Sequence, residues 1–310
     1  MPLKLQKTET ENQLLLERIH HAKRYALVVD KDLCVGCEIC KTVCPREAIK
    51  VTRANKKMGE KTLNPVIDVD LDKCHFCGIC NSICPFGAIT VLIDNKNILS
   101  VVEKESFPEL IREIRVDPTK CDSSCADYEN ACPLNLITVT YRTNEGKEIP
   151  NANALSEKER ESLKPEITVK QERCPCCRLC ELEGPSDALQ VKPIFSGVLK
   201  INESKCPEGC RDCLDVCPIK GALYLSEDGK IKVNELYCVY CGACRIACPV
   251  EGALELQRTS VRHTSIKSGA WNKALEKLAS TKEISKELRA KSAAKAREAV
   301  DRRFEEKRSD

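Results

Sequence analysis

Short runs of alternating apolar and polar residues recur along the chain, and they come in pairs. Six such pairs lie at residues 25–30 and 48–53, 64–70 and 88–94, 113–117 and 136–141, 165–170 and 188–193, 197–202 and 221–226, and 231–237 and 252–257. A period of two predicts β-strands, because successive side chains of a strand point to opposite faces of a sheet. Each pair encloses a cysteine-bearing loop, and we expect a short helix after the last cysteine of each loop.

The N-terminal segment, residues 1–24, has a different pattern. It places Leu14, Leu15, Leu16 and Ile19 in a charged setting, which we interpret as an amphipathic helix. A second helix is predicted within the linker 95–114, where Pro108 would occupy its first turn.

The C-terminal segment, residues 259–310, contains no cysteine and is predicted to be helical. Trp271, Leu275 and Leu278 recur at i, i+4 and i+7, on one helix face, and an Ala-, Lys-, Arg- and Glu-rich sequence follows. This segment is too polar to fold around a core of its own. We therefore expect an arm that binds another subunit, with Trp271 as its anchor; a solvated tail is the alternative.

Composition points to metal rather than disulfides. The 310 residues include 23 cysteines, while only 4% of residues are aromatic, so bound metal is the natural replacement for a large apolar core. Disulfides would need an oxidising compartment, and the N-terminus shows no apolar signal core. The net charge of +3 and the lack of a long apolar stretch favour neither a nucleic-acid nor a membrane partner. We expect a cytoplasmic protein.

The cysteines fall into six motifs. Those starting at Cys34, Cys74 and Cys238 each read C-x2-C-x2-C-x3-C-P. In bacterial two-cluster ferredoxins this run supplies three thiolates to one [4Fe–4S] cluster, and its fourth cysteine binds the other cluster of the pair. A structural zinc scaffold is the competing interpretation, but zinc sites usually divide their ligands into two separated pairs.

The third and fourth motifs have each lost one ligand. The fifth motif, CPEGCRDCLDVCP, keeps four cysteines with one extra residue in its first gap. The third motif, CDSSCADYENACP, aligns with it but has Tyr128 in place of the third cysteine. The fourth motif, CPCCRLCELEGP, has Gly184 in place of its fourth cysteine. If motifs three and four form a pair, ligand exchange places both losses on the same cluster.

This arithmetic predicts five [4Fe–4S] clusters. Their ligand sets are Cys34, Cys37, Cys40 and Cys84; Cys74, Cys77, Cys80 and Cys44; Cys174, Cys177, Cys180 and Cys132; Cys206, Cys210, Cys213 and Cys248; and Cys238, Cys241, Cys244 and Cys217. Cys121, Cys125 and Cys176 remain. We expect them to be free buried thiols; the alternative is a mononuclear or irregular metal site with help from Asp122 or Cys176.

The predicted fold class is α+β, with three tandem bacterial-type 2[4Fe–4S] ferredoxin domains and helical N- and C-terminal extensions. The domains are residues 25–94 with two clusters, 112–197 with one cluster lost, and 198–258 with two clusters. The middle domain would then be a single stepping stone between two full pairs. The sequence contains no P-loop, GxGxxG fingerprint or Ser-His-Asp set, so we expect an electron-transfer protein without a catalytic centre of its own.

The tandem motifs, the fifth motif CPEGCRDC and the tail sequence RTSVRHTSIKSGAWNKALEKL resemble the polyferredoxin subunit of archaeal formylmethanofuran dehydrogenase. The resemblance implies catalytic partner subunits that carry tungsten or molybdenum and interconvert CO2 and formyl-methanofuran in methanogenesis. Members of that family typically carry eight clusters in four domains, so the cluster number is taken from this sequence instead. The alternative function is a polyferredoxin of a hydrogenase or heterodisulfide reductase system, with ferredoxin as a further possible partner.

Overall fold

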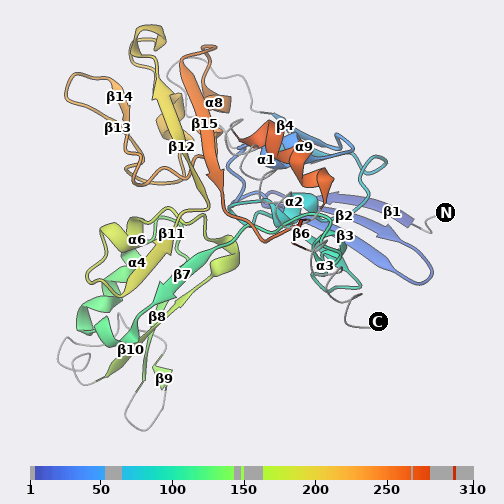
Figure 1. Ribbon diagram of the computed structural model, residues 1–310, viewed down its shortest axis with the longest axis horizontal. Coiled ribbons are helices and arrows are strands. Elements are labelled where there is room, and N and C mark those ends of the chain that lie inside the picture. Colours follow the sequence, from blue (N-terminus) through green and yellow to red (C-terminus); the bar gives the residue numbers. More distant parts are fainter. Residues whose placement is uncertain are drawn as a thin grey trace.

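The computed structural model describes residues 4–52, 65–142, 148–149, 163–266, 268–279 and 296–297. Figure 1 shows three groups of strands and short helices, one each from the N-terminal, middle and later parts of the sequence, which meet near the centre of the molecule. None of the helices in the described residues is long and apolar enough to cross a membrane.

All twelve alternating runs contain a strand, as predicted. The strands are β3 (Arg24–Asp30), β4 (Ile49–Thr52), β5 (Val66–Val69), β6 (Ile89–Ile93), β7 (Glu113–Val116), β8 (Ile137–Arg142), β10 (Lys164–Val169), β11 (Leu189–Lys192), β12 (Phe195–Ile201), β13 (Leu223–Leu225), β14 (Ile231–Val233) and β15 (Leu254–Val261). A short strand, β9 (Glu148–Ile149), also pairs with β8.

Strand pairing joins the motifs two by two. The outer strands pair as β3–β6, β7–β11 and β12–β15, and the inner strands pair as β4–β5, β8–β10 and β13–β14, all antiparallel. In the outer pairs the strand before one motif meets the strand after the next motif, and in the inner pairs the strand after one motif meets the strand before the next. The first motif is therefore coupled to the second, the third to the fourth and the fifth to the sixth, and the fourth is not coupled to the fifth.

The N-terminal segment is a β-hairpin, so the predicted helix is wrong. Strands β1 (Lys4–Glu9) and β2 (Gln13–Ile19) extend the first sheet in the order β1-β2-β3-β6. Leu14 and Leu16 are fully buried while Leu15 is only half-buried. This is a period of two, and it follows from pairing with β3, which turns every second side chain toward the core.

The linker is also mostly non-helical. It contains only the short helix α3 (Ser100–Glu103), and the chain around Pro108 is not helical, contrary to the predicted helix. Phe107 and Leu110 are buried instead, and the Leu110 amide donates to the Ser82 carbonyl at 3.3 Å. The linker thus packs as irregular chain between the first and third groups of strands.

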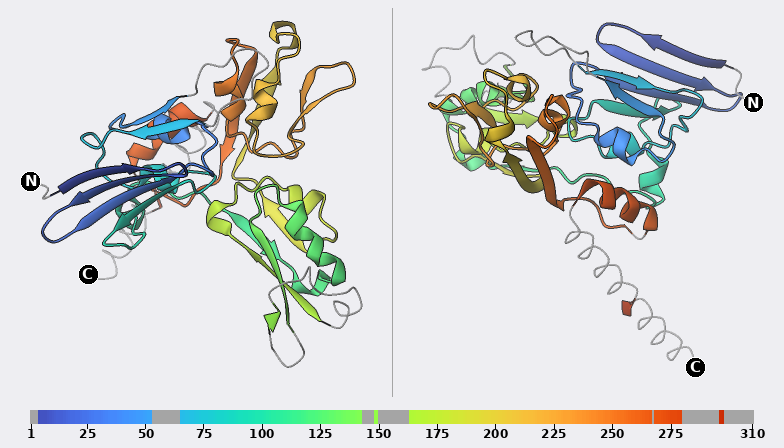
Figure 2. Two further views of the ribbon diagram at one scale, coloured as in Figure 1. Left: turned by 180° about the vertical axis from the view of Figure 1, so that it is seen from behind. Right: turned by 90° about the horizontal axis from the view of Figure 1, so that it is seen from above.

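Helix α9 (Gly269–Leu278) confirms the helical spacing at Trp271, Leu275 and Leu278, but its apolar face covers this chain and not a partner. All three side chains are buried, and α9 packs against α1 (Ile39–Val43), beside which Figures 1 and 2 place it. The Trp271 ring meets Phe107 edge-on, with the ring centroids 5.2 Å apart. Trp271 is therefore not an exposed anchor; residues 280–295 and 298–310 of the predicted arm lie outside the described residues.

The short helix of each motif precedes the position of the fourth cysteine, which is Gly184 in the fourth motif, and does not follow it as predicted. These helices are α1, α2 (Ile79–Ser82), α4 (Tyr128–Ala131), α6 (Leu179–Leu182), α7 (Asp212–Asp215) and α8 (Ala243–Ala247). At Cys44, which ends α1, the backbone is extended, with φ −64° and ψ 115°. Pro45 explains this end, because a residue before proline is disfavoured in the helical conformation.

Candidate iron–sulfur centres

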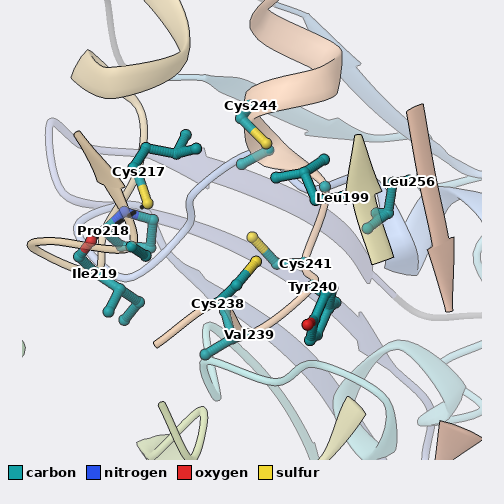
Figure 3. Close-up of a pocket in the computed structure, with 14 residues that line it drawn as sticks. Leu199, Cys217, Pro218, Ile219, Cys238, Val239, Tyr240, Cys241, Cys244 and Leu256 are labelled. Carbon is teal, nitrogen blue, oxygen red and sulfur yellow. Dashed lines mark hydrogen bonds between the residues drawn. The ribbon is translucent and has the colours of Figure 1, made fainter. Parts of the chain in front are cut away.

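Four cavities are each lined by the four cysteines of one predicted ligand set. They hold Cys34, Cys37, Cys40 and Cys84; Cys44, Cys74, Cys77 and Cys80; Cys132, Cys174, Cys177 and Cys180; and Cys217, Cys238, Cys241 and Cys244. Figure 3 shows the last set, with four sulfurs that face a common space from two segments of the chain. Three cysteines of each set belong to one motif and the fourth belongs to its paired motif.

Of the fifth predicted set, Cys206 and Cys210 line a more open space. Cys213 and Cys248 are not among the residues that line it, but the charge of Cys248 acts on both Cys206 and Cys213. The cavity volume is about 250 Å³, compared with about 20 Å³ for the sixth-motif cavity. We name the five spaces the first-, second-, fourth-, fifth- and sixth-motif cavities, after the motif that supplies three cysteines.

Left-handed backbone curls four of these motifs around their cavities. The residue before the second cysteine has positive φ in each: Gly36 (66°), Phe76 (52°), Cys176 (56°) and Tyr240 (48°). The residue after that cysteine does too: Glu38 (59°), Gly78 (85°), Arg178 (67°) and Gly242 (90°). Left-handed residues that flank a residue of negative φ form turns of the kind in which successive backbone N–H groups point toward an anion. Cys176 therefore occupies the loop position of Gly36, which is not a ligand position.

Buried thiols make these cavities suited to the cationic core of an iron–sulfur cluster. Burial, with help from neighbouring cysteines, raises the pKa of Cys177, Cys180, Cys213 and Cys217 to about 12. Burial likewise raises the pKa of Cys40 well above its ordinary value. Four thiols in one apolar space cannot all ionise alone, but metal binding deprotonates such ligands. The donor set, four cysteines in an otherwise apolar wall, fits a [4Fe–4S] cluster.

The place of the sixth cluster is filled by Tyr128. Its side chain is fully buried, and its hydroxyl donates to the Ser186 carbonyl. A Cβ at Gly184 would lie 2.3 Å from the Tyr128 Cε1 atom and 2.2 Å from the Cys180 carbonyl oxygen. A cysteine at position 184 would therefore collide with the tyrosine, so the two lost ligands are coupled by packing.

The leftover thiols form a pair beside Tyr128. The Cys125 thiol, which has no exposed surface, donates to the Cys121 sulfur at 2.9 Å. Asp122 instead accepts hydrogen bonds from Ser124, and Cys176 lies against Cys174. In the part of the chain that the structure describes, no group of three or more His, Cys, Asp or Glu side chains is placed to hold a single metal ion.

Two arginines beside the cavities were missed by the sequence interpretation. Arg112 donates to the carbonyl oxygens of Cys84 and Cys174, at 2.6 and 3.1 Å. Arg258 donates to the carbonyl of Cys241 at 2.7 Å. Neither arginine lies in a cysteine motif, and only the packing of distant segments brings them to the cavities, so no local pattern could have identified them.

Comparison with known proteins adds two matched regions and one long structural match. Models of the 4Fe-4S dicluster domain match residues 33–88 and 198–249. Each matched region has the ligands for two clusters, so four [4Fe–4S] clusters are indicated. The polyferredoxin-like subunit of the aliphatic sulfonate oxidoreductase of Pyrococcus furiosus is 30% identical over 92 residues. That match covers 26% of this chain and about half, 52%, of the relative.

A chain of the formate dehydrogenase – heterodisulfide reductase – formylmethanofuran dehydrogenase complex from Methanospirillum hungatei is similar over nearly its whole length. It is 31% identical, the match covers 90% of this chain and 92% of that chain, and the TM-score is 0.74. The mixed strands and helices around the cysteine motifs agree with ferredoxin-like 4Fe-4S domains. The two 4Fe-4S dicluster domains and the similarity to a polyferredoxin-like subunit indicate a polyferredoxin-like role in iron–sulfur electron transfer.

Proposed function

We propose that the chain holds five [4Fe–4S] clusters, in the ligand sets predicted from the sequence. The observation that carries this proposal is that the fourth-motif cavity is lined by Cys132 together with Cys174, Cys177 and Cys180, while Tyr128 fills the place of its partner cavity. Four clusters would belong to the two matched dicluster regions and the fifth to the middle of the chain. Each cluster would supply a carrier for single electrons.

We also propose three ferredoxin domains, at residues 25–94, 112–197 and 198–258. Strand pairing between motifs one and two, three and four, and five and six supports this division. The hairpin β1–β2 would belong to the first domain, because it continues that domain's sheet. Strand β15 runs to Val261, so the third domain would end a few residues later than the sequence predicted.

The proposed role is an electron-transfer subunit of a formylmethanofuran dehydrogenase complex, with the catalytic centre in other subunits. Two independent observations support it. The fifth motif and the tail resemble the polyferredoxin subunit of that enzyme, and the structural match is to a chain of a complex that contains formylmethanofuran dehydrogenase. This chain would carry electrons to or from the subunits that reduce CO2 to the formyl level.

A polyferredoxin of a heterodisulfide reductase or hydrogenase system is the second candidate. It is favoured by the same complex, which also contains heterodisulfide reductase and formate dehydrogenase. Anaerobic co-purification from the native organism separates the candidates, because the catalytic subunits that accompany the chain differ. Recovery with a tungsten or molybdenum subunit that oxidises formyl-methanofuran supports the first role. Recovery only with a heterodisulfide reductase or a hydrogenase contradicts it and supports the second.

A further inference from the structure

Arg258 lies where the first and third groups of strands meet, beside the first- and sixth-motif cavities. Its guanidinium donates to three main-chain carbonyls, those of Tyr240 at 2.8 Å, Cys241 at 2.7 Å and Leu278 at 3.2 Å. It also lies 5.4 Å from the centre of the Phe195 ring. The charges of both Cys37 and Cys241 act on it, so it faces one ligand of each cavity.

Arg112 occupies the corresponding place between the first- and fourth-motif cavities. Its two hydrogen bonds reach the carbonyls of Cys84, a ligand of the first set, and Cys174, a ligand of the fourth. Backbone also meets backbone here, because a Cβ at Gly87 would lie 2.5 Å from the Glu172 carbonyl oxygen. The two segments therefore approach each other closely near the place where Arg112 bridges the two sets.

In the described part of the chain, no carboxylate pairs with the positive charge of either arginine. Within the described ranges, the ion pairs found involve neither Arg258 nor Arg112. A partly buried guanidinium held only by carbonyl oxygens keeps its charge, because arginine does not deprotonate in proteins. A [4Fe–4S] cluster with four thiolates is anionic, so two such clusters would supply the missing negative charge.

The three cavities concerned share one apolar wall. A single cluster of packed residues contains Cys84, Cys177 and Cys241, with Cys34, Cys37 and Cys217 at its margin. The first-motif cavity therefore contacts two cavities outside its own strand-paired unit. This differs from the sequence expectation that the middle region lies between two full pairs.

We propose that Arg258 and Arg112 are positioning residues that each hold two cluster cavities together and raise the midpoint potentials of both clusters. Arg258 acts on the first- and sixth-motif clusters and Arg112 on the first- and fourth-motif clusters. The reason is electrostatic: reduction adds a negative charge to a cluster, and a fixed cation at its rim stabilises that charge. This inference rests on the cluster occupancy proposed above.

The test uses the anaerobically purified full chain and redox titration followed by EPR, with resonances assigned by a serine substitution at one ligand of each cavity. Arg258→Met should lower the midpoint potentials of the first- and sixth-motif clusters, and Arg112→Met those of the first- and fourth-motif clusters. Arg258→Lys and Arg112→Lys keep the charge and should restore most of each shift. Arg142→Gln is the control, because Arg142 lies on β8 and forms an exposed ion pair with Glu166 at a distance of 2.7 Å.

One cluster that responds to both substitutions is the result expected, and shifts confined to other clusters, or absent, overturn the inference. Iron and sulfide contents of the same samples show separately whether the clusters are present. A failure of the proposed cluster occupancy can therefore be told apart from a failure of the inference about the arginines. If the Met variants lose iron, the inference is tested instead by EPR of the fully reduced unmodified chain. Magnetic coupling of one cluster to two clusters outside its own pair supports the inference, and coupling only within pairs contradicts it.

Discussion

Replacing Tyr128 with alanine should destabilise the middle of the chain without changing its iron content. The ring is fully buried between Cys125, Ile137 and Val139 in the middle core, and truncating a buried aromatic side chain to alanine costs about 3–5 kcal/mol. Tyr128→Phe keeps the ring and loses only the hydrogen bonds of the hydroxyl to the Ser186 carbonyl and the Ser186 hydroxyl, which should cost about 1 kcal/mol.

Gly184→Ala tests the same packing from the other side. The new Cβ would lie 2.3 Å from the Tyr128 ring and 2.2 Å from the Cys180 carbonyl oxygen, and overpacking of this kind costs about 1–3 kcal/mol. In the double variant with Tyr128→Ala, one of the two collisions is gone. The double variant should therefore lose less stability than the sum of the losses in the two single variants, as is usual for residues in contact.

The assay is urea unfolding of the anaerobic holoprotein, followed by circular dichroism, with iron measured on each sample. Midpoints should fall in the order unmodified chain, Tyr128→Phe, Gly184→Ala, Tyr128→Ala. A Tyr128→Ala midpoint equal to that of the unmodified chain would refute the reasoning, because the ring would then fill no packed space. Additive costs in the double variant would show that Tyr128 and Gly184 are not coupled.

Three further predictions follow from the same structure. Trp271→Ala should lower the free energy of unfolding by about 3–5 kcal/mol, since the ring is fully buried against this chain; a loss below about 1 kcal/mol would instead favour a partner-binding role. Cys174→Ala should remove about four irons per chain and Cys176→Ala none, and equal losses would make Cys176 a ligand. Burial raises the pKa of Cys121 to about 12. Its alkylation near pH 8 should therefore be slower than that of a cysteine in a peptide, and should accelerate as the pH rises. Alkylation at the peptide rate would contradict this.

Cysteine spacing was enough to predict which four cysteines line each of four cavities, because ligand exchange between paired motifs can be worked out from the sequence alone. Tyr128 and Gly184 could be recognised as lost ligands from alignment alone. Their coupling could not, because it depends on a collision between a ring and a Cβ that only the packed structure shows. The strands could be predicted for a similar reason, since each short run shows the alternation of apolar and polar residues on its own.

The predictions that were wrong, and the residues that were missed, also share a cause. Leu14, Leu15 and Leu16 form an unbroken apolar run, which fits a helix and a buried strand equally, and pairing of β2 with β3 decides between them. Trp271 lies on the predicted face of a helix. That face is buried by α1 and Phe107, which are far away in the sequence. Contacts between distant segments also place Arg112 and Arg258, which no motif contains.

The most direct test of the central claim is the iron and acid-labile sulfide content of the full chain, purified without oxygen. Five clusters predict about 20 irons and about 20 sulfides per chain. About 24 of each would mean that a sixth cluster forms despite Tyr128 and Gly184. About 16 of each would mean that the fourth-motif cavity, with Cys132, Cys174, Cys177 and Cys180 along its wall, holds no cluster, and either result would contradict the account.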